Sequence, residues 1–309
     1  MTPLAAELIG LILGLLFGSF LNVCIARVPR GESVVRPGSH CMRCGHAVRW
    51  FDNIPVLSWL LLRGRCRDCG SRFSWQYPVV ELATGLWFAF AALRMWDAWH
   101  PPANVLSSYL PFWTFQTVGL GVLGFLLIGL TVVDWQTQRL PDAFTLSGIV
   151  IGVFLVCLQA IFLEPGEDQI TFVSQHLRLS SPGSFAARGN VFLTGPESLI
   201  FGRIAAVCGA ALILLVIRWT YRALRKRDGL GLGDVKMLAM AAAFLGFWPA
   251  VLTLFLGLML ACGYVVWLYV RGRAGALTRL PLGTFLGLGG LITAVFGDSI
   301  LFWYRGLFV

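Results

Sequence analysis

Charged residues are scarce in this sequence. Only 13% of its 309 residues are Asp, Glu, Lys or Arg, whereas 57% are hydrophobic. A soluble domain is about a quarter charged, because it has a polar surface to cover. This chain has too few charges to coat a water-exposed globule of its size, and its apolar residues come in long blocks. We therefore expect an all-α polytopic membrane protein.

Complete nucleotide-binding motifs are also absent. The segment GLGLG (229–233) could pass for a turn that cradles phosphate, but it lacks a preceding strand and the GK[ST] or GxGxxG spacing. Glycine at Gly231 and Gly233 more simply allows close backbone approach and flexibility beside Asp234. No soluble-type dinucleotide-binding or methyltransferase fold is recognisable.

The apolar blocks predict about eight transmembrane helices. A helix that spans the hydrocarbon core of a bilayer needs about 20 apolar residues. The predicted spans are residues 8–26, 78–96, 113–133, 143–163, 198–218, 236–248, 250–270 and 282–303. The span 236–248 is too short to be assigned on its own, but it lies between the polar or turn segments GLGLGD and GFWPA.

The net charge of +9 follows the topology of the chain. The flank before the first span has Glu7 and no Lys or Arg, unlike a signal peptide, and basic residues follow at Arg27 and Arg30. With the N-terminus outside, the basic segments all face the cytoplasm, as the positive-inside rule requires. These segments are 27–77, 218–236 and 271–279, whereas the alternate loops 97–112 and 164–197 have two Arg between them. We expect a lipid bilayer as partner and no nucleic acid.

The chain divides into three parts. Residues 1–26 form the first transmembrane helix, and residues 27–77 form a polar cytoplasmic insert. Residues 78–309 form a seven-helix membrane bundle, in which 164–197 is a long external loop with room for a short hairpin.

The insert contains four cysteines in two CxxC pairs. Cys41 and Cys44 are followed, after 21 residues, by Cys66 and Cys69. Two such pairs can complete the tetrahedral four-thiolate shell of a zinc ribbon. Disulfides or redox chemistry are one alternative, although the cytoplasm is reducing, and cysteines without a common role are another. A closed site of this kind is structural and does not activate water, so the chemistry lies elsewhere.

The other cysteines and the flanking histidines have simpler interpretations. His40 and His46 flank the first CxxC pair and could serve as ligands, although four Cys already suffice. The remaining cysteines are isolated in apolar spans and are interpreted as small packed hydrophobes. They are Cys24, Cys157, Cys208 and Cys262.

Three acidic residues lie at the edges of spans, where a charge is costly and usually functional. Asp134 closes one span, Asp234 opens another, and Asp142 follows Pro141 in the manner of a helix N-cap. Two carboxylates from distant parts of a chain can share a proton. One then activates water while the other protonates a carbonyl, which is peptide hydrolysis without metal.

Asp134 and Asp234 fit this role, although both could instead be capping or topology-flanking acids. Asp134 lies at a helix C-terminus, which disfavours an anion, and Asp234 at an N-terminus, which favours one. From the helix ends alone, Asp134 is predicted to hold the shared proton and Asp234 to be the ionised base.

Several segments resemble those of bacterial type IV prepilin peptidases, GxGD intramembrane aspartyl proteases. Along nearly the whole chain they are GSFLNVCIARVP (18–29), CMRCG (41–45), NIPVLSWLLLRGRCRDCG (53–70), YPVVELATG (77–85), DWQTQRLPD (134–142), GLGDVKMLA (231–239) and LPLGTFLGLG (280–289). The resemblance implies a bacterial inner-membrane peptidase that cuts the basic leader from prepilins or type II secretion pseudopilins after a glycine. Many members also N-methylate the new terminus with S-adenosylmethionine.

The resemblance also implies roles for particular residues. It places the catalytic pair on Asp134 and Asp234, with support from Asp142 and from Lys236, Gly231 and Gly233 around the second aspartate. Gly64 matches a position linked to methyl transfer, and the cysteine insert is associated with methylating members. Met42 and Gln76, both in the insert, depart from the family pattern.

Two other classes of function remain open at this point. A transporter could use Asp134 and Asp234 as a proton relay, although such acids usually lie near the middle of the membrane. A non-catalytic scaffold of a secretion machine would need the zinc only for folding.

Overall fold

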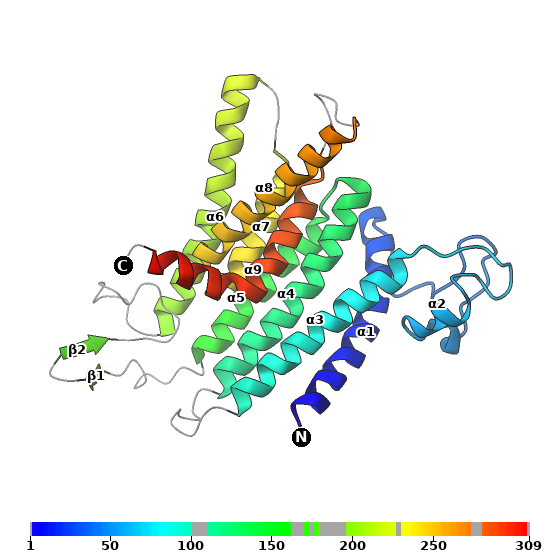
Figure 1. Ribbon diagram of the computed structural model, residues 1–309, viewed down its shortest axis with the longest axis horizontal. Helices are drawn as coiled ribbons and strands as arrows, with labels where there is room; N and C mark the ends of the chain where they lie inside the picture. The colour runs from blue at the N-terminus through cyan, green and yellow to red at the C-terminus, as the bar shows by residue number, and fades with distance from the viewer. Residues whose placement is uncertain are drawn as a thin grey trace.

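The computed structural model describes residues 2–100, 110–161, 170–173, 176–179, 196–226, 230–272 and 280–307. Eight helices in these ranges pack into a bundle, with the insert beside one end of α1 and α3 (Figure 1). They are α1 (Pro3–Arg27), α3 (Gln76–Trp99), α4 (Leu110–Thr137), α5 (Asp142–Ile161), α6 (Pro196–Arg225), α7 (Leu232–Leu245), α8 (Phe247–Val270) and α9 (Leu282–Gly306). The predicted all-α membrane fold is confirmed.

Within the described ranges, seven of these helices are long and apolar enough to cross a bilayer. The eighth, α7, has 14 residues. At 1.5 Å per residue it is about 21 Å long, shorter than a hydrocarbon core of about 30 Å. Its residues Val235 and Met237–Ala243 are buried, and α7 contacts α4, α5, α6, α8 and α9. The short predicted span 236–248 corresponds to α7, which begins four residues earlier and is largely buried among the other helices.

Helix α4 lies at the centre of the bundle and contacts α1, α3, α5, α7 and α9. Its side chains Leu123, Leu127, Leu130 and Val133 are fully buried. A helix that is apolar on all sides is expected to be surrounded by other helices. The last turn of α4 carries Asp134, so the central position of the helix brings this carboxylate to a meeting point of several elements.

Helices α1 and α3 pack closely through small residues. A Cβ atom added at Gly14 would lie 2.7 Å from Cα of Gly85, and one at Gly18 would lie 2.7 Å from Cα of Glu81. Small residues four apart let helix backbones approach in this way. The close approach brings Asn22 of α1 to Tyr77 of α3, whose carbonyl oxygen accepts a 3.1 Å hydrogen bond from the Asn22 amide.

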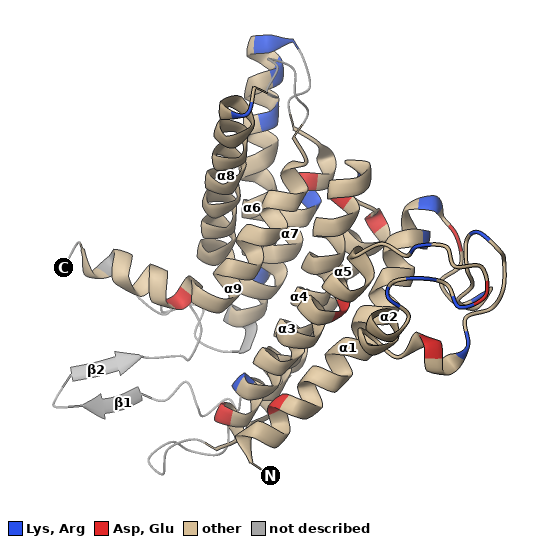
Figure 2. Cartoon of the chain, turned by 45° about the vertical axis from the view of Figure 1, so that its right-hand side comes forward, with Lys and Arg blue, Asp and Glu red and all other residues tan. Residues whose placement is uncertain are grey.

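The insert consists of loops with the short helix α2 (Leu57–Leu61) and two 3₁₀ turns, Val28–Arg30 and Trp50–Asn53. Figure 2 shows basic residues gathered in the insert and at the C-terminal end of α6. The gathering agrees with the charge distribution in the sequence, although Arg227, Arg273 and Arg279 lie outside the described residues.

A two-stranded antiparallel hairpin, β1 (Ile170–Val173) and β2 (His176–Leu179), occurs within the predicted external loop. It confirms that the loop has room for a hairpin. The rest of this loop up to residue 195 lies outside the described residues.

Candidate active site

Asp134 is held by the start of α9. Its Oδ2 accepts a 2.7 Å hydrogen bond from the backbone N–H of Thr284 and lies 3.1 Å from the Thr284 hydroxyl. That hydroxyl is also 3.1 Å from the carbonyl oxygen of Thr131. Asp134 is buried, with 4% of its surface exposed. Donors directed at a buried carboxylate stabilise its charged form.

Asp234 lies in the first turn of α7 and is partly buried. Its Oδ2 accepts a 3.3 Å hydrogen bond from the backbone N–H of Gly231, the N-cap residue of that helix. The GLGD segment thus forms the start of α7, with the aspartate folded back over its glycines. Asp134 and Asp234 are close enough for their charges to repel each other.

Leu140 packs between the segments that surround the two aspartates. A Cβ atom at Gly233 would lie 2.9 Å from Cβ of Leu140, and one at Gly283 would lie 2.9 Å from both Cδ1 of Leu140 and Cγ of Asp134. Only glycine leaves room for this side chain at both positions. The segments DWQTQRLPD, GLGD and LPLGT therefore meet at one place, although 150 residues separate Asp134 from Thr284.

Asp142 is the first residue of α5, one position inside the predicted N-cap. Its Oδ1 lies 2.6 Å from Nζ of Lys236 on α7. This ion pair joins α5 to α7 beside Asp234. The Asp142 side chain is 61% exposed, in contrast to the buried Asp134.

The two aspartates lie at the end of the bundle that carries the insert. The side chain of Gln136, two residues after Asp134, is hydrogen-bonded to the side chain of Gln76 at the start of α3. Because α3 begins where the insert ends, this contact ties the aspartate end of α4 to the insert. Asp134, Asp142 and Asp234 thus occupy one end of the helices.

The four cysteines of the insert come together. Their sulfur atoms all lie within 4.8 Å of one another, and Sγ of Cys41 is 3.8 Å from Sγ of Cys69. A tetrahedral zinc ion with Zn–S bonds of about 2.3 Å separates its ligands by roughly 3.8 Å, so the residues fit zinc. Within the part of the chain that the structure describes, this is the one group found that could hold a metal, and it includes neither His40 nor His46.

Backbone hydrogen bonds shape the two CxxC turns alike. The N–H of Cys41 donates to the carbonyl oxygen of His46, and the N–H of Cys66 donates to that of Ser71. The side chain of Ser71, which the sequence did not single out, lies 3.4 Å from Sγ of Cys41 and 3.1 Å from Sγ of Cys69. The hydrogen bond with Ser71, followed by the backbone hydrogen bonds of Cys44 and Arg43, lowers the pKa of Cys41 to about 5, which favours the thiolate that a metal requires.

Gly64 lies between the CxxC pairs with a φ of +64°, and a Cβ atom there would be 2.7 Å from the indole ring of Trp59. The Trp59 ring packs on Trp75, with the ring centroids 4.0 Å apart. Gly64 is therefore required both by its backbone conformation and by the position of Trp59. It lies in the insert, apart from the two aspartates.

The fold and these contacts define a class: a polytopic helical membrane protein with two aspartates at one end of the bundle. A cluster of four cysteines that could hold a metal lies beside that end. Two family descriptions match the sequence, the bacterial peptidase A24 N-terminal domain over residues 12–95 and the type IV leader peptidase family over residues 121–266. No solved structure gave a significant match.

Several curated proteins are similar to the chain. A prepilin leader peptidase/N-methyltransferase of Pseudomonas putida is 31% identical over 94% of this chain and 90% of the relative. The protein of the same name in Myxococcus xanthus is 35% identical over 87% of this chain, but the match spans only 65% of that relative. A type 4 prepilin-like proteins leader peptide-processing enzyme of Escherichia coli O78:H11 is 31% identical over 94% of each chain. The chain belongs to the type IV leader peptidase family.

Proposed function

We propose that this protein is an intramembrane aspartyl endopeptidase that cuts the basic leader from type IV prepilins, type II secretion pseudopilins or both, after a glycine. The observation that carries the proposal is the convergence of Asp134 and Asp234, from distant parts of the chain, around Leu140. The names of its relatives, which describe prepilin leader processing, support the choice of substrate.

The hydrogen bonds of the two carboxylates are the basis for assigning one as the base and the other as the acid. Asp134 faces two donors of Thr284, whereas Asp234 accepts the longer bond from Gly231. We therefore assign the ionised base to Asp134 and the shared proton to Asp234, the reverse of the assignment from the helix ends alone. Asp134 takes a proton from water, the resulting hydroxide attacks the scissile carbonyl carbon, and Asp234 protonates the carbonyl oxygen.

Collapse of the tetrahedral intermediate completes the cleavage. The bond between the carbonyl carbon and the nitrogen breaks, and the nitrogen receives a proton from Asp134. At the same time Asp234 takes a proton back from one hydroxyl group of the intermediate, so both carboxyl groups return to their starting states. The leader leaves with a free carboxyl group and the mature protein with a free amine. Coupled carboxylates titrate as a pair, so their activity is expected to show two apparent pKa values that belong to both residues.

A second activity is proposed for the same protein, the N-methylation of the new terminal residue. S-adenosylmethionine supplies the methyl group when bound. The proposal rests on the N-methyltransferase in the names of several relatives. The four cysteines, which could hold zinc, serve in this proposal as a structural staple of the insert and take no part in cleavage.

The orientation completes the proposal. Since positive residues favour the cytoplasmic side, the insert and the aspartates are assigned to the cytoplasmic face of the bacterial inner membrane. A leader rich in basic residues would meet the active site there, before the mature part of the pilin leaves the bilayer. The proposed parts are the first helix (1–26), the insert (27–77) and the bundle (78–309).

Co-expression with a candidate prepilin tests the peptidase. Asp134→Asn and Asp234→Asn are each expected to abolish processing, as judged by the mass of the pilin N-terminus, while still inserting in the membrane. Asp97→Asn, the same change at an exposed residue of α3, serves as control and is expected to process normally. Normal processing by either active-site variant would defeat the proposal and favour a transporter or a scaffold.

A further inference from the structure

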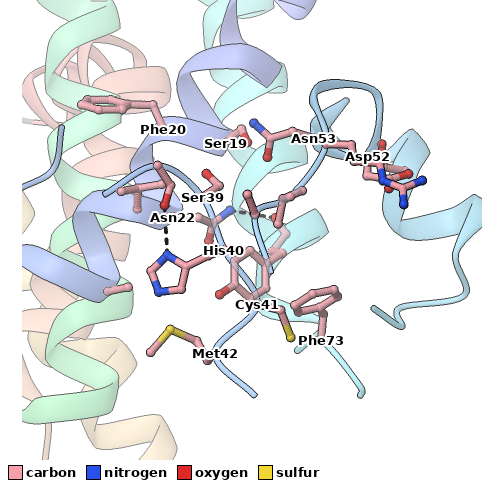
Figure 3. Close-up of a pocket in the computed structure, with 18 of the residues that line it drawn as sticks. Ser19, Phe20, Asn22, Ser39, His40, Cys41, Met42, Asp52, Asn53 and Phe73 are labelled. Atoms are coloured by element: carbon pink, nitrogen blue, oxygen red, sulfur yellow. Dashed lines mark hydrogen bonds between the residues drawn. The ribbon is translucent and has the colours of Figure 1, made fainter. Parts of the chain in front are cut away.

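A pocket of about 930 Å³ lies between the insert and the neighbouring ends of α1 and α3. Its lining residues all fall between Leu16 and Glu81, inside the N-terminal family domain at residues 12–95. Figure 3 shows Ser19 and Asn22 of α1 beside His40, Asn53 and Phe73 of the insert around this space. The pocket is separate in sequence from the two aspartates of the candidate active site.

Glu81 is a buried carboxylate in the wall of this pocket. Only 7% of the residue is exposed. Its Oε2 accepts a 2.7 Å hydrogen bond from the backbone N–H of Val56, and the Ser19 side chain also interacts with it. In the described ranges no Lys or Arg forms an ion pair with Glu81. A buried carboxylate that lacks a cation is costly unless a cationic ligand completes the site.

Two further polar atoms of the pocket residues have no partner. Asn22 is 3% exposed, and its amide donates to Tyr77 while its Oδ1 accepts nothing. The indole N–H of Trp59 is also buried without an acceptor. Buried polar groups are nearly always hydrogen-bonded, so an acceptor and a donor left open beside one pocket indicate a polar ligand.

The volume of the pocket and its remaining lining residues indicate which class of ligand it can bind. Small-molecule pockets usually enclose about 300–1,000 Å³, which fits a nucleoside-sized compound. Phe20, Phe73 and Tyr77 provide aromatic faces, and Arg27 and Arg49 provide positive charge in the same lining. A flat base, a carboxylate and a cation are thus all accommodated, and S-adenosylmethionine combines these three groups in one molecule.

We propose that this pocket is the binding site for S-adenosylmethionine, with Glu81 facing its positively charged sulfonium and Asn22 contributing a further buried acceptor. The inference rests on the proposed methyltransferase activity and gives it a location. The site also gives Gly64 a structural role, because a side chain at that position would displace Trp59, which lines the pocket.

Direct binding measurements on the purified full-length protein test the location. Wild-type protein is titrated calorimetrically with S-adenosylmethionine and with S-adenosylhomocysteine, which lacks the sulfonium charge. Glu81→Gln and Asn22→Ala are expected to raise the Kd for S-adenosylmethionine tenfold or more, about 1.4 kcal/mol. Glu81→Gln is expected to weaken S-adenosylhomocysteine binding less. Asp97→Asn removes a carboxylate from the exposed far end of the same helix and is expected to bind as wild type.

Photochemical labelling of the wild-type protein locates the ligand even if a variant fails to fold. Ultraviolet cross-linking with methyl-labelled S-adenosylmethionine, followed by peptide mass analysis, is expected to label segments within 16–41 or 52–81. If the label is confined to residues 121–266, or if the Kd is unchanged in both variants, the proposed binding site is wrong. The proposed methyltransferase activity is still supported in that case, provided that the wild type methylates the pilin. A wild-type protein that neither binds the compound nor yields methylated pilin would overturn the proposed methyl transfer and this site with it, even where leader cleavage proceeds.

Discussion

The backbone N–H of Thr284 donates a 2.7 Å hydrogen bond to Oδ2 of Asp134, and the Thr284 hydroxyl lies 3.1 Å from the same oxygen. The first turn of α9 thereby supplies donors to an acid that ends α4. In the proposed mechanism this contact keeps Asp134 ionised and orients it toward water. Thr284 lies beyond the matched peptidase region at residues 121–266, so the site extends past that region.

Thr284→Val is expected to reduce the rate of prepilin cleavage about tenfold. The change removes the hydroxyl but keeps the backbone donor, and a hydrogen bond to a charged group contributes roughly 1.5–3 kcal/mol. Thr284→Ser is expected to retain most of the activity. The matched control is Thr253→Val in α8, since the buried Thr253 hydroxyl has no partner. The measurement is kcat/KM on a purified prepilin, and equal rates for Thr284→Val and wild type would refute the contact's role.

The ion pair of Asp142 with Lys236 is expected to be a modest positioning contact. Both side chains are partly exposed, at 61% and 33%, and exposed pairs contribute about 0.2–1 kcal/mol. A double-mutant cycle with Asp142→Asn and Lys236→Met is expected to show a coupling energy in that range in thermal melts, weaker at high salt. Cleavage by Asp142→Asn is expected to fall only severalfold. Complete loss of cleavage in that variant would instead give Asp142 a direct part in the chemistry.

Cys66→Ser is expected to lower the zinc content of the purified protein and loosen the insert. A four-thiolate site that loses one ligand binds its metal much more weakly, and metal binding is coupled to folding in small modules. Metal analysis by mass spectrometry reports the zinc, and hydrogen exchange reports protection in residues 40–72. Cys262→Ser, an exposed cysteine of α8, is the control and is expected to retain both. Full zinc content in Cys66→Ser would count against a four-cysteine site.

The ion pair of Asp52 with Arg67 predicts a pH dependence of the insert. The Arg67 guanidinium donates hydrogen bonds to both oxygens of Asp52 and holds the pKa of Asp52 below its ordinary value. A carboxylate with a depressed folded-state pKa stabilises the fold above its unfolded pKa of about 3.9. The stabilisation is lost as the pH falls through the lower, folded-state pKa.

Hydrogen exchange of the insert at several pH values checks this expectation. Arg67→Met is expected to exchange faster than wild type near neutral pH, and the difference is expected to shrink below about pH 4 as Asp52 becomes protonated. Arg49 and Asp68, at 3.6 Å and both well exposed, provide a comparison, and Arg49→Met is expected to change little. A difference for Arg67→Met that grows toward low pH would contradict the assignment.

Gly64→Ala is expected to impair methylation of the mature pilin more than cleavage of the leader. The added Cβ combines an unfavourable φ of +64° with a 2.7 Å approach to the Trp59 ring. Gly31→Ala separates these two effects, because Gly31 has a φ of +69° but nothing within 4 Å of the added atom. Mass analysis of the pilin N-terminus reads both activities at once. Equal methylation by Gly64→Ala and Gly31→Ala would show that the Trp59 contact is unimportant.

The sequence alone determined the membrane class, most helix positions and the identity of the four cysteines that gather. These features depend on local composition and on short spacings between residues, and both can be read from the apolar blocks and the CxxC pairs. The short helix α7 was also found, although its start at Leu232 lay four residues before the predicted span. The start of a helix is hard to predict within a Gly-rich segment, because glycine has a low intrinsic helix propensity.

Only the tertiary structure decided which groups surround the aspartates. Leu140, Gly283 and Thr284 lie in segments that resemble the family, but they carry no charge and nothing in those segments predicts their contacts. Gly283 and Thr284 meet Asp134 because α9 packs on α4, and Leu140 lies against Gly283. Those contacts are the reason that we propose the opposite of the protonation assignment that the helix ends predict. Glu81 did carry a signal, as an acid within an apolar span, but its importance emerged only where α1, α3 and the insert enclose a pocket. A side chain's charge is readable from sequence, whereas its burial and its partners arise from contacts between segments far apart in the chain.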